Sequence, residues 1–462
     1  MFDYAILGLG KTGLAVLEYL TRHEPKAKVL ASDSGADSAL QTSCRRRFSG
    51  TAFEFGGHTD QVLDAKMVVK SPGISWRAPI LRKLRESSVR VTSEIEFGFE
   101  RLGARPRTVI GVTGTNGKTT TTHLLGHLFS LSGIKTVVAG NIGAPLIEKA
   151  PEIDSETALI LELSSYQLED SGRLDLDAAV LLNITPDHLD HHGGWDQYVN
   201  AKAKIFSFVR KEGFEIVNFE DKAAKQIPSG GAAARRLFFS SRRVLKEGAW
   251  IADGKIQLKT QNSKLKTNAA IFPCPNLFGD HNFENQMAAV LAALVSGINP
   301  GSLQEALAPY HPPPHRLEKL GEISGALFIN DSKATNVDSV VVALRALEPL
   351  IEKRGGKIHL LMGGQDKGSP YGALADFKAV LRGVYVYGQA KAKIESDLGS
   401  KIPSETADNL SQAVKAAFGR AGQGDIVLLS PACASFDQFQ NYEHRGEEFR
   451  KIFNELRLTN TE

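Results

Sequence analysis

The chain has 462 residues, of which 42% are hydrophobic and 23% are charged, and its formal net charge at pH 7 is +3. This length exceeds what a single hydrophobic core usually serves, so we expect about three domains of a globular protein. A net charge this close to zero argues against a general nucleic-acid-binding protein.

The cysteines and the first residues indicate the compartment. Cys44, Cys274 and Cys433 are scattered and make neither a disulfide framework nor a Cys-x-x-Cys pair, which is typical of a reducing environment. No apolar run is long enough to span a membrane, and no leader pattern opens the chain. We therefore expect a cytoplasmic monomer that acts on small molecules, inserts into no membrane and binds no nucleic acid.

The first predicted domain, residues 1–95, has the pattern of a Rossmann-like α/β fold. A strand at residues 4–7 leads into Gly8-Leu9-Gly10-Lys11-Thr12-Gly13 and a helix, and a second strand ends at Asp33. An acid twenty residues after such a glycine motif is where dinucleotide folds bind a ribose. The pattern predicts a diphosphate next to a ribose, which leaves NAD and a UDP-sugar open. Further on, Ser71-Pro72-Gly73 offers either more backbone N–H groups or a simple tight turn.

The second predicted domain, residues 96–312, alternates strands and helices as a mostly parallel, P-loop ATPase-like sheet requires. We expect strands at residues 109–113, 134–139, 158–163 and 178–184, a β-hairpin at residues 250–256, and a helix from near Asn282. Three prolines at residues 312–314 predict a linker to the last domain.

A phosphate cradle is predicted where the first of these strands meets a helix. Gly114-Thr115-Asn116-Gly117-Lys118-Thr119-Thr120 brings small residues, a helix N-terminus, a lysine and a hydroxyl suited to Mg²⁺ into one turn. The general P-loop pattern fails, because Val112 stands where its first glycine belongs. The alternative is a glycine turn that caps an ordinary βα unit.

Two more groups follow strands of the same sheet. Glu162 ends the strand at residues 158–163, where a carboxylate near a phosphate cradle often ligates Mg²⁺; the alternative is an ordinary strand terminus. His188 lies in a loop rich in acids and histidines. One histidine acting on Mg²⁺ or substrate is favoured over a zinc site made of His188, His191 and His192. The basic helix around Lys202 reads, by itself, as a solvated surface.

The third predicted domain, residues 313–462, is a second Rossmann-like, doubly wound α/β unit with strands at residues 326–329, 357–362, 384–387 and 425–429. The loops at residues 331–336, 363–367 and 430–437 follow three of these strands and predict a pocket for a small anion such as a dicarboxylate. Arg316, after the prolines, suits a phosphate. Cys433 lacks an evident histidine partner and reads as a small buried residue.

Read together, these motifs resemble the Mur ligases, the ATP-dependent amino-acid ligases of bacterial cell-wall synthesis, over essentially the whole chain. The matching stretches are Gly-Thr-x-Gly-Lys-Thr at residues 114–119, then residues 161–168, 183–190, 315–316 and 331–336. The last of these, with residues 430–439, resembles the branch that adds D-glutamate. The resemblance implies that ATP phosphorylates the carboxylate of UDP-N-acetylmuramoyl-L-alanine and that the D-glutamate amine attacks the acyl phosphate, with two Mg²⁺ sites.

The resemblance also implies a role for each matching residue. Catalytic roles fall to Lys118, His188, Lys202 and Lys333; metal ligands are Thr119, Glu162, His188 and Lys202 as a carbamate; ATP contacts are residues 114–120, Asn282, Arg316 and Asp331; UDP-substrate contacts are Lys11, Thr12, Asp33, Ser34, Ser71, Pro72, Gly73, Asn141 and Gln167; D-glutamate contacts are Thr335, Lys367, Ser430 and Phe436.

Three other functions are compatible with parts of the sequence. Another ligase of the same superfamily, with a different amino acid or like a folylpolyglutamate synthase, is the nearest. The glycine motif ahead of Asp33 favours a UDP-sugar domain instead. A dehydrogenase would leave the cradle around Lys118 without a role. A nucleotide-binding regulator without catalysis would not need Glu162, His188 and Lys202 together.

Overall fold

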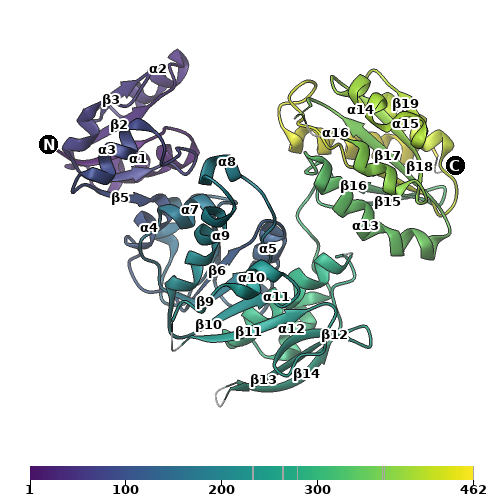
Figure 1. Cartoon of the computed structure of the whole chain (residues 1–462), viewed down its shortest axis with the longest axis horizontal. Coiled ribbons are helices and arrows are strands. Elements are labelled where there is room, and N and C mark those ends of the chain that lie inside the picture. The colour runs from purple at the N-terminus through teal and green to yellow at the C-terminus, as the bar shows by residue number, and fades with distance from the viewer. Residues whose placement is uncertain (232–233, 263–264, 278, 367, 369, 461–462) are drawn as a thin grey trace. The chain divides into compact units, whose positions relative to one another are not determined.

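The structure is a computed structural model that describes residues 1–231, 234–262, 265–277, 279–366, 368 and 370–460 (Figure 1). The chain divides into two compact units, Met1–Cys274 with Phe283–Tyr310, and Pro275–Asn282 with His311–Glu462. Three sheets lie within them, two in the first unit and one in the second, which confirms the prediction of three α/β parts.

The N-terminal sheet has five parallel strands in the order β3-β2-β1-β4-β5. Its apolar residues point to both faces, as a parallel sheet covered by helices requires, and α1 packs on one face and α3 on the other. The elements are β1 (Phe2–Leu7), α1 (Lys11–His23), β2 (Val29–Asp33), α2 (Ser38–Arg47), β3 (Ala52–Phe55), η1 (Asp60–Asp64), β4 (Ala65–Lys70), α3 (Pro79–Glu86), β5 (Arg90–Ser93) and α4 (Glu94–Phe99).

The central sheet has nine strands in the order β14-β13-β12-β11-β10-β9-β6-β8-β7. The pairs from β12 to β7 are parallel, and β13 pairs antiparallel with both of its neighbours, so the predicted mostly parallel sheet is confirmed. The strands are β6 (Thr108–Thr113), β7 (Thr136–Gly140), β8 (Ala158–Glu162), β9 (Leu176–Leu181), β10 (Val209–Asn218), β11 (Arg235–Ser240), β12 (Gly248–Ala252), β13 (Lys255–Asn262) and β14 (Leu265–Ile271).

Helices follow most of the parallel strands and bring their N-termini to one edge of this sheet. They are α5 (Lys118–Leu131), α6 (Leu146–Lys149), η2 (Ala150–Glu152), α7 (Ser165–Asp170), α8 (Leu189–His192), α9 (Trp195–Ala203), η3 (Lys204–Phe208), α10 (Lys222–Gln226), α11 (Asp280–Val295) and α12 (Pro300–Leu307). Strand β6, which leads into the predicted cradle, is buried along its whole length between β8 and β9.

The C-terminal sheet has the order β15-β16-β20-β17-β18-β19, with only β15 antiparallel to its neighbour. One face packs on α13 and α14 and the other on α15 and α16, so the predicted doubly wound unit is confirmed. The elements are β15 (Glu318–Ile323), β16 (Ala326–Asn330), α13 (Val337–Arg354), β17 (Ile358–Gly363), η4 (Gly372–Phe377), β18 (Leu381–Tyr387), α14 (Lys391–Leu398), η5 (Gly399–Lys401), β19 (Ser404–Thr406), α15 (Leu410–Arg420), β20 (Ile426–Leu429) and α16 (Tyr442–Thr459).

Candidate active site

The predicted cradle is a tight turn between β6 and α5. Gly114 and Gly117 have φ of +157° and +84°, and α5 begins at Lys118. A Cβ at position 117 would lie 2.2 Å from the Asn285 Oδ1 atom, so the site excludes larger residues sterically as well as by its backbone conformation. The N-terminus of α5 therefore sits against a turn whose backbone an anion can approach closely.

The loop after β9 fastens this turn in place. The Thr115 amide donates to the Asn183 carbonyl at 3.0 Å, the Asn116 amide donates to Asn183 Oδ1 at 2.8 Å, and Asn183 Nδ2 donates back to the Asn116 carbonyl at 3.1 Å. The predicted strand at residues 178–184 starts two residues after the beginning of β9 and runs three residues past its end at Leu181, since Asn183 leaves the ladder to hold the turn. The cradle is thus preorganised by side chain as well as by backbone.

Two lysine amines meet at one carbonyl of the turn. Lys118 Nζ and Lys202 Nζ each donate to the Gly114 carbonyl at 2.8 Å, and Lys202 is 2% exposed. Burial, and then the charge of Lys118, hold the pKa of Lys202 well below its usual value, against the opposite pull of Asp187 and Glu162. This environment therefore favours the neutral form of the Lys202 amine more than a solvated surface would. The expectation of a solvated lysine is wrong at this position.

Tyr198 is a neighbour that sequence reasoning missed. Its hydroxyl lies 2.9 Å from Thr115 Oγ1, and its ring centroid lies 4.8 Å from Lys202 Nζ. Burial raises the pKa of Tyr198 to about 12, so the phenol stays protonated and can donate. Tyr198 lies four residues before Lys202 on α9 and links that lysine to the cradle. This i, i+4 spacing places the two side chains on one face of the helix, and it was the sequence signal that could have revealed the contact.

Glu162 closes β8 beside the cradle and is 1% exposed. Its Oε1 accepts from Asn141 Nδ2 at 2.7 Å, and the Asn141 amide donates to the Glu162 carbonyl at 2.9 Å. Its Oε2 is buried, and no hydrogen bond to it is found within the described ranges of the chain. An orphaned carboxylate oxygen next to a phosphate cradle fits a cation ligand.

The histidine loop does not form the alternative zinc site. Among the residues that the structure describes, no three His, Cys, Asp or Glu side chains are placed to hold a metal ion. His192 is turned inward, with Nε2 at 2.9 Å from Ser165 Oγ and Nδ1 at 3.1 Å from Glu169 Oε2. His188 is half exposed, has a φ of +52° and lies 3.4 Å from Asp187.

The predicted diphosphate turn of the N-terminal sheet is also formed. A Cβ at Gly13 would lie 1.9 Å from the Gly8 carbonyl, so helix α1 can approach β1 only with glycine there. Asp33 Oδ2 accepts from the Leu9 amide at 2.6 Å and Oδ1 accepts from the Gly35 amide at 2.7 Å. Each oxygen keeps a second lone pair, so Asp33 shapes the turn and can still accept from a ribose hydroxyl.

Contacts join this turn to its neighbours. Ser71 Oγ donates to the Gly8 carbonyl at 3.0 Å, which brings the two predicted UDP loops together. Lys11 Nζ donates to the Gly143 carbonyl at 2.5 Å, in the loop that carries Asn141. Gln167, in contrast, is 6% exposed, and its Oε1 accepts from the backbone and hydroxyl of Ser164 in a capping box at the start of α7.

In the second unit, three loops follow the adjacent strands β16, β20 and β17, as predicted. Asp331 is buried; its Oδ2 accepts from Ser430 Oγ at 2.9 Å, and its Oδ1 accepts from the Leu317 amide at 3.2 Å. Burial raises the pKa of Asp331 to about 7. Ser430 is fully buried and its hydroxyl is engaged by Asp331, so it lies beneath the loop surface.

Arg445 is the main residue of this region that the sequence did not reveal. Its guanidinium is fully buried and donates to Ser332 Oγ at 2.9 Å, to the Ser332 carbonyl at 2.8 Å and to the Cys433 carbonyl at 3.1 Å. It therefore ties two of the loops to α16. Cys433 is fully buried, as expected, against the Tyr371 hydroxyl at 3.1 Å.

The remaining predicted residues of this unit differ in exposure. Lys333 Nζ lies 3.9 Å from the Tyr442 ring centroid, and Phe436 is 69% exposed. Arg316 and Thr335 are half-buried, and Asn282 is buried near the start of α11. Lys367 lies outside the described residues.

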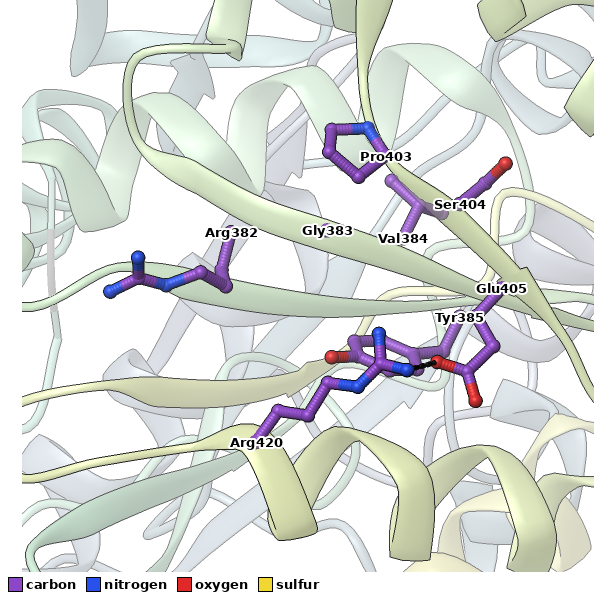
Figure 2. A pocket seen from close by; sticks show the side chains of 8 residues that line it. All are labelled: Arg382, Gly383, Val384, Tyr385, Pro403, Ser404, Glu405 and Arg420. Atoms are coloured by element: carbon purple, nitrogen blue, oxygen red, sulfur yellow. Dashed lines mark ion pairs between the residues drawn. The ribbon is translucent and has the colours of Figure 1, made fainter. Parts of the chain in front are cut away.

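A pocket elsewhere in the unit is shown in Figure 2. It lies at the starts of β18 and β19, the opposite end of the parallel strands from the three loops. Arg420 pairs with Glu405 at 2.6 Å, and Arg382 extends away from both. Since its facing charges are already paired, we assign it no part in the candidate site. The lining residues are Arg382, Gly383, Val384, Tyr385, Pro403, Ser404, Glu405 and Arg420.

Comparison with known proteins gives three matches in chain order. Residues 3–93 match the "Mur ligase MurD-like, N-terminal domain", residues 112–293 the "Mur ligase middle domain", and residues 315–433 the "Mur ligase, glutamate ligase domain". A UDP-N-acetylmuramoylalanine--D-glutamate ligase of Elusimicrobium minutum is 41% identical over 471 residues, covering 98% of this chain and 97% of that protein. One of Koribacter versatilis is 38% identical, with the same coverages.

A solved structure agrees in fold. The UDP-N-acetylmuramate-alanine ligase of Thermotoga maritima has a TM-score of 0.58 at 17% identity and covers 98% of this chain and 100% of that one. No helix among the described residues is long and apolar enough to cross a membrane.

Proposed function

Because the chain belongs to the Mur ligase family, we propose that it uses ATP to add D-glutamate to UDP-N-acetylmuramoyl-L-alanine in peptidoglycan precursor synthesis, releasing ADP and phosphate. The observation that carries this is agreement along 98% of the chain with relatives that share that one activity in their names. We also propose domain boundaries at residues 1–95, 96–312 and 313–462, and action as a cytoplasmic monomer.

The cradle at residues 114–120 is assigned to the ATP phosphates. The N-terminus of α5 and the glycine backbone offer N–H donors, and the Lys118 amine, now on two backbone carbonyls at 2.8 Å, supplies a full positive charge. Lys118 would steady the β- and γ-phosphates as charge builds on the transferring group. The contacts to Asn183 hold the backbone of the turn in place before ATP binds.

Thr119 and Glu162 are assigned to one Mg²⁺, and His188 with Lys202 to a second. The buried, unpartnered Oε2 of Glu162 fits the first assignment. The buried Lys202 amine, with its lowered pKa, fits a carbamate: in the unprotonated form its lone pair attacks CO₂, the nitrogen loses one proton, and an amine becomes an oxygen ligand. When bound, Mg²⁺ neutralises phosphate charge during transfer.

The N-terminal domain is assigned to the UDP end of the first substrate. The two glycine-containing turns, joined by Ser71 and Gly8, offer backbone donors for a diphosphate, and Asp33 can accept from the ribose. The resemblance assigns Lys11, Thr12, Ser34, Pro72 and Gly73 to the same site. Asn141 and Gln167 are assigned to the muramoyl part.

The C-terminal residues are assigned to D-glutamate and to ATP. Lys333, Thr335, Lys367, Ser430 and Phe436 are proposed for the amino acid, and Asn282, Arg316 and Asp331 for the nucleotide. A lysine and hydroxyls at strand ends suit a dicarboxylate. The burial of Ser430 under Asp331 supports an indirect role for its hydroxyl, through that carboxyl group.

The reaction then follows from charge and position. An oxygen of the L-alanyl carboxylate attacks the γ-phosphorus, the bond to the β-phosphate oxygen breaks, and an acyl phosphate forms with ADP. The D-glutamate amine, having lost a proton, attacks the acyl carbon; the tetrahedral intermediate expels phosphate and leaves an amide. Preorganised lysines stabilise the extra negative charge in both steps.

A coupled assay tests the proposal. The purified protein with ATP, Mg²⁺ and UDP-N-acetylmuramoyl-L-alanine is expected to release phosphate when D-glutamate is added. L-glutamate, L-lysine and meso-diaminopimelate serve as matched controls. Release that depends on one of the other amino acids instead would overturn the assignment of D-glutamate.

A further inference from the structure

Two donors flank the turn at residues 71–74, and both reach the same carboxylate. Lys70, the last residue of β4, donates from Nζ to Asp170 Oδ2 at 2.6 Å. Trp76, just after the turn, donates from Nε1 to Asp170 Oδ1 at 2.7 Å. One side chain of the central domain thus holds both ends of a turn that belongs to the N-terminal sheet.

The contact is buried and directional. The Lys70 and Asp170 side chains are each 1% exposed, and the Arg85 guanidinium lies 4.6 Å from the centroid of the Trp76 ring. Burial raises the pKa of Asp170 to about 6, so at pH 8 the group is an ionised acceptor for both donors. A buried ion pair is, by itself, weak evidence that the contact stabilises the fold. Apolar packing would also hold the two surfaces together, but only directional bonds such as these fix their register.

Asp170 is also connected rigidly to the candidate metal edge. It is the last residue of α7, and that helix begins at Ser165, three residues after Glu162. The Leu163 amide donates to the Val112 carbonyl at 2.9 Å, which ties the intervening residues to β6. On the other side, Ser71 is tied to the end of β1 by two bonds: its amide donates to the Leu7 carbonyl at 2.8 Å, and its hydroxyl donates to the Gly8 carbonyl at 3.0 Å.

We propose that Asp170 is a positioning residue that sets the distance between the diphosphate turns and the Glu162 edge of the central sheet. A substrate held by its UDP end then presents its carboxylate at the transferring phosphate. The inference rests on the proposed function, because only a ligand that touches both places needs that distance. UDP alone would contact only the turns, so its binding does not depend on that distance.

The test compares a short ligand with a spanning one at pH 8. In Asp170→Asn, the affinity for UDP, by titration calorimetry, is expected to stay within about twofold of wild type. The affinity for UDP-N-acetylmuramoyl-L-alanine, and kcat/KM for it, are expected to fall about tenfold or more, since a hydrogen bond to a charged group is lost and a small misplacement is costly. KM for ATP is expected to be unchanged.

Two further variants keep the test decisive. Trp76→Phe keeps an aromatic ring and the Lys70–Asp170 pair but removes the indole N–H donor, so the same pattern is expected with a smaller loss of affinity, even if Asp170→Asn folds poorly. Asp60→Asn breaks the exposed ion pair with Lys83, inside the N-terminal domain, and is the matched control without effect. The calorimetric comparison needs no turnover, so an inactive wild type would refute the proposed function without deciding this inference.

Equal losses of UDP and full-substrate affinity in both variants would overturn the positioning role and leave a merely structural one. Unchanged affinity and kcat/KM for the full substrate in both variants would overturn it as well.

Discussion

Two glycines of the diphosphate turn separate folding from binding. At Gly13 a Cβ would lie 1.9 Å from the Gly8 carbonyl oxygen, so Gly13→Ala must push α1 away from β1. Overpacking of this kind typically costs about 1–3 kcal/mol, and we expect the upper end because the obstacle is backbone. At Gly10 no atom lies within 4 Å of the built Cβ, and φ is −71°, so Gly10→Ala is expected to change unfolding free energy by no more than about 0.5 kcal/mol.

Binding is expected to respond in the opposite way at Gly10. Its exposed backbone is where a diphosphate would approach, and a methyl group there keeps the phosphates away. We predict that Gly10→Ala weakens UDP binding about tenfold, or about 1.4 kcal/mol, with unchanged thermal stability. Titration calorimetry and thermal denaturation measure the two effects. If Gly10→Ala binds UDP as wild type does, the turn is a structural feature and the assigned diphosphate site is wrong.

Three more predictions concern buried charges. Lys202→Ala is expected to lose most phosphate release and to regain part of it with a short carboxylic acid such as acetate; indifference to the substitution would refute the carbamate. Wild type is expected to gain about 2.7 kcal/mol of stability at Mg·ATP one hundredfold above its Kd, and Glu162→Gln far less, by thermal denaturation; equal gains would contradict the metal role. Because the folded pKa of Asp331 is about 7 against 3.8 unfolded, its contribution to stability is present at low pH and lost as pH rises to 7. Asp331→Asn cannot titrate, so urea denaturation should show it gaining up to about 4 kcal/mol relative to wild type between pH 4 and 8; a constant difference would refute this.

The sequence predicted best what depends on local backbone. Glycine conformation, the helix N-terminus and the strand before them make the cradle around Lys118, and all three are visible within ten residues. The same holds for Gly8–Gly13 and the strand before it. Boundaries were less accurate: the predicted strand at residues 178–184 runs past the end of β9, because the tertiary bonds of Asn183 to the turn outweigh its β-like surroundings.

What the sequence did not reveal depends on contacts between distant segments. Lys202 lies two residues before Lys204 in the chain, and only the packing of Tyr198 and Gly114 around it distinguishes it from a solvated lysine. Arg445 reads as the start of a surface helix, yet its partners lie 12 to 113 residues away in the chain. No sequence signal marked Asp170, since its partners Lys70 and Trp76 are far from it in the chain.

The most direct test of the account follows oxygen from the first substrate. UDP-N-acetylmuramoyl-L-alanine labelled with ¹⁸O at both oxygens of its alanyl carboxylate is incubated with the enzyme, ATP, Mg²⁺ and D-glutamate. If one carboxylate oxygen attacks the γ-phosphorus and later leaves with the phosphate, mass spectrometry will find one ¹⁸O in the released phosphate and one in the new amide. Unlabelled phosphate released alongside the new amide, or no product with D-glutamate, would contradict the proposed ligase mechanism.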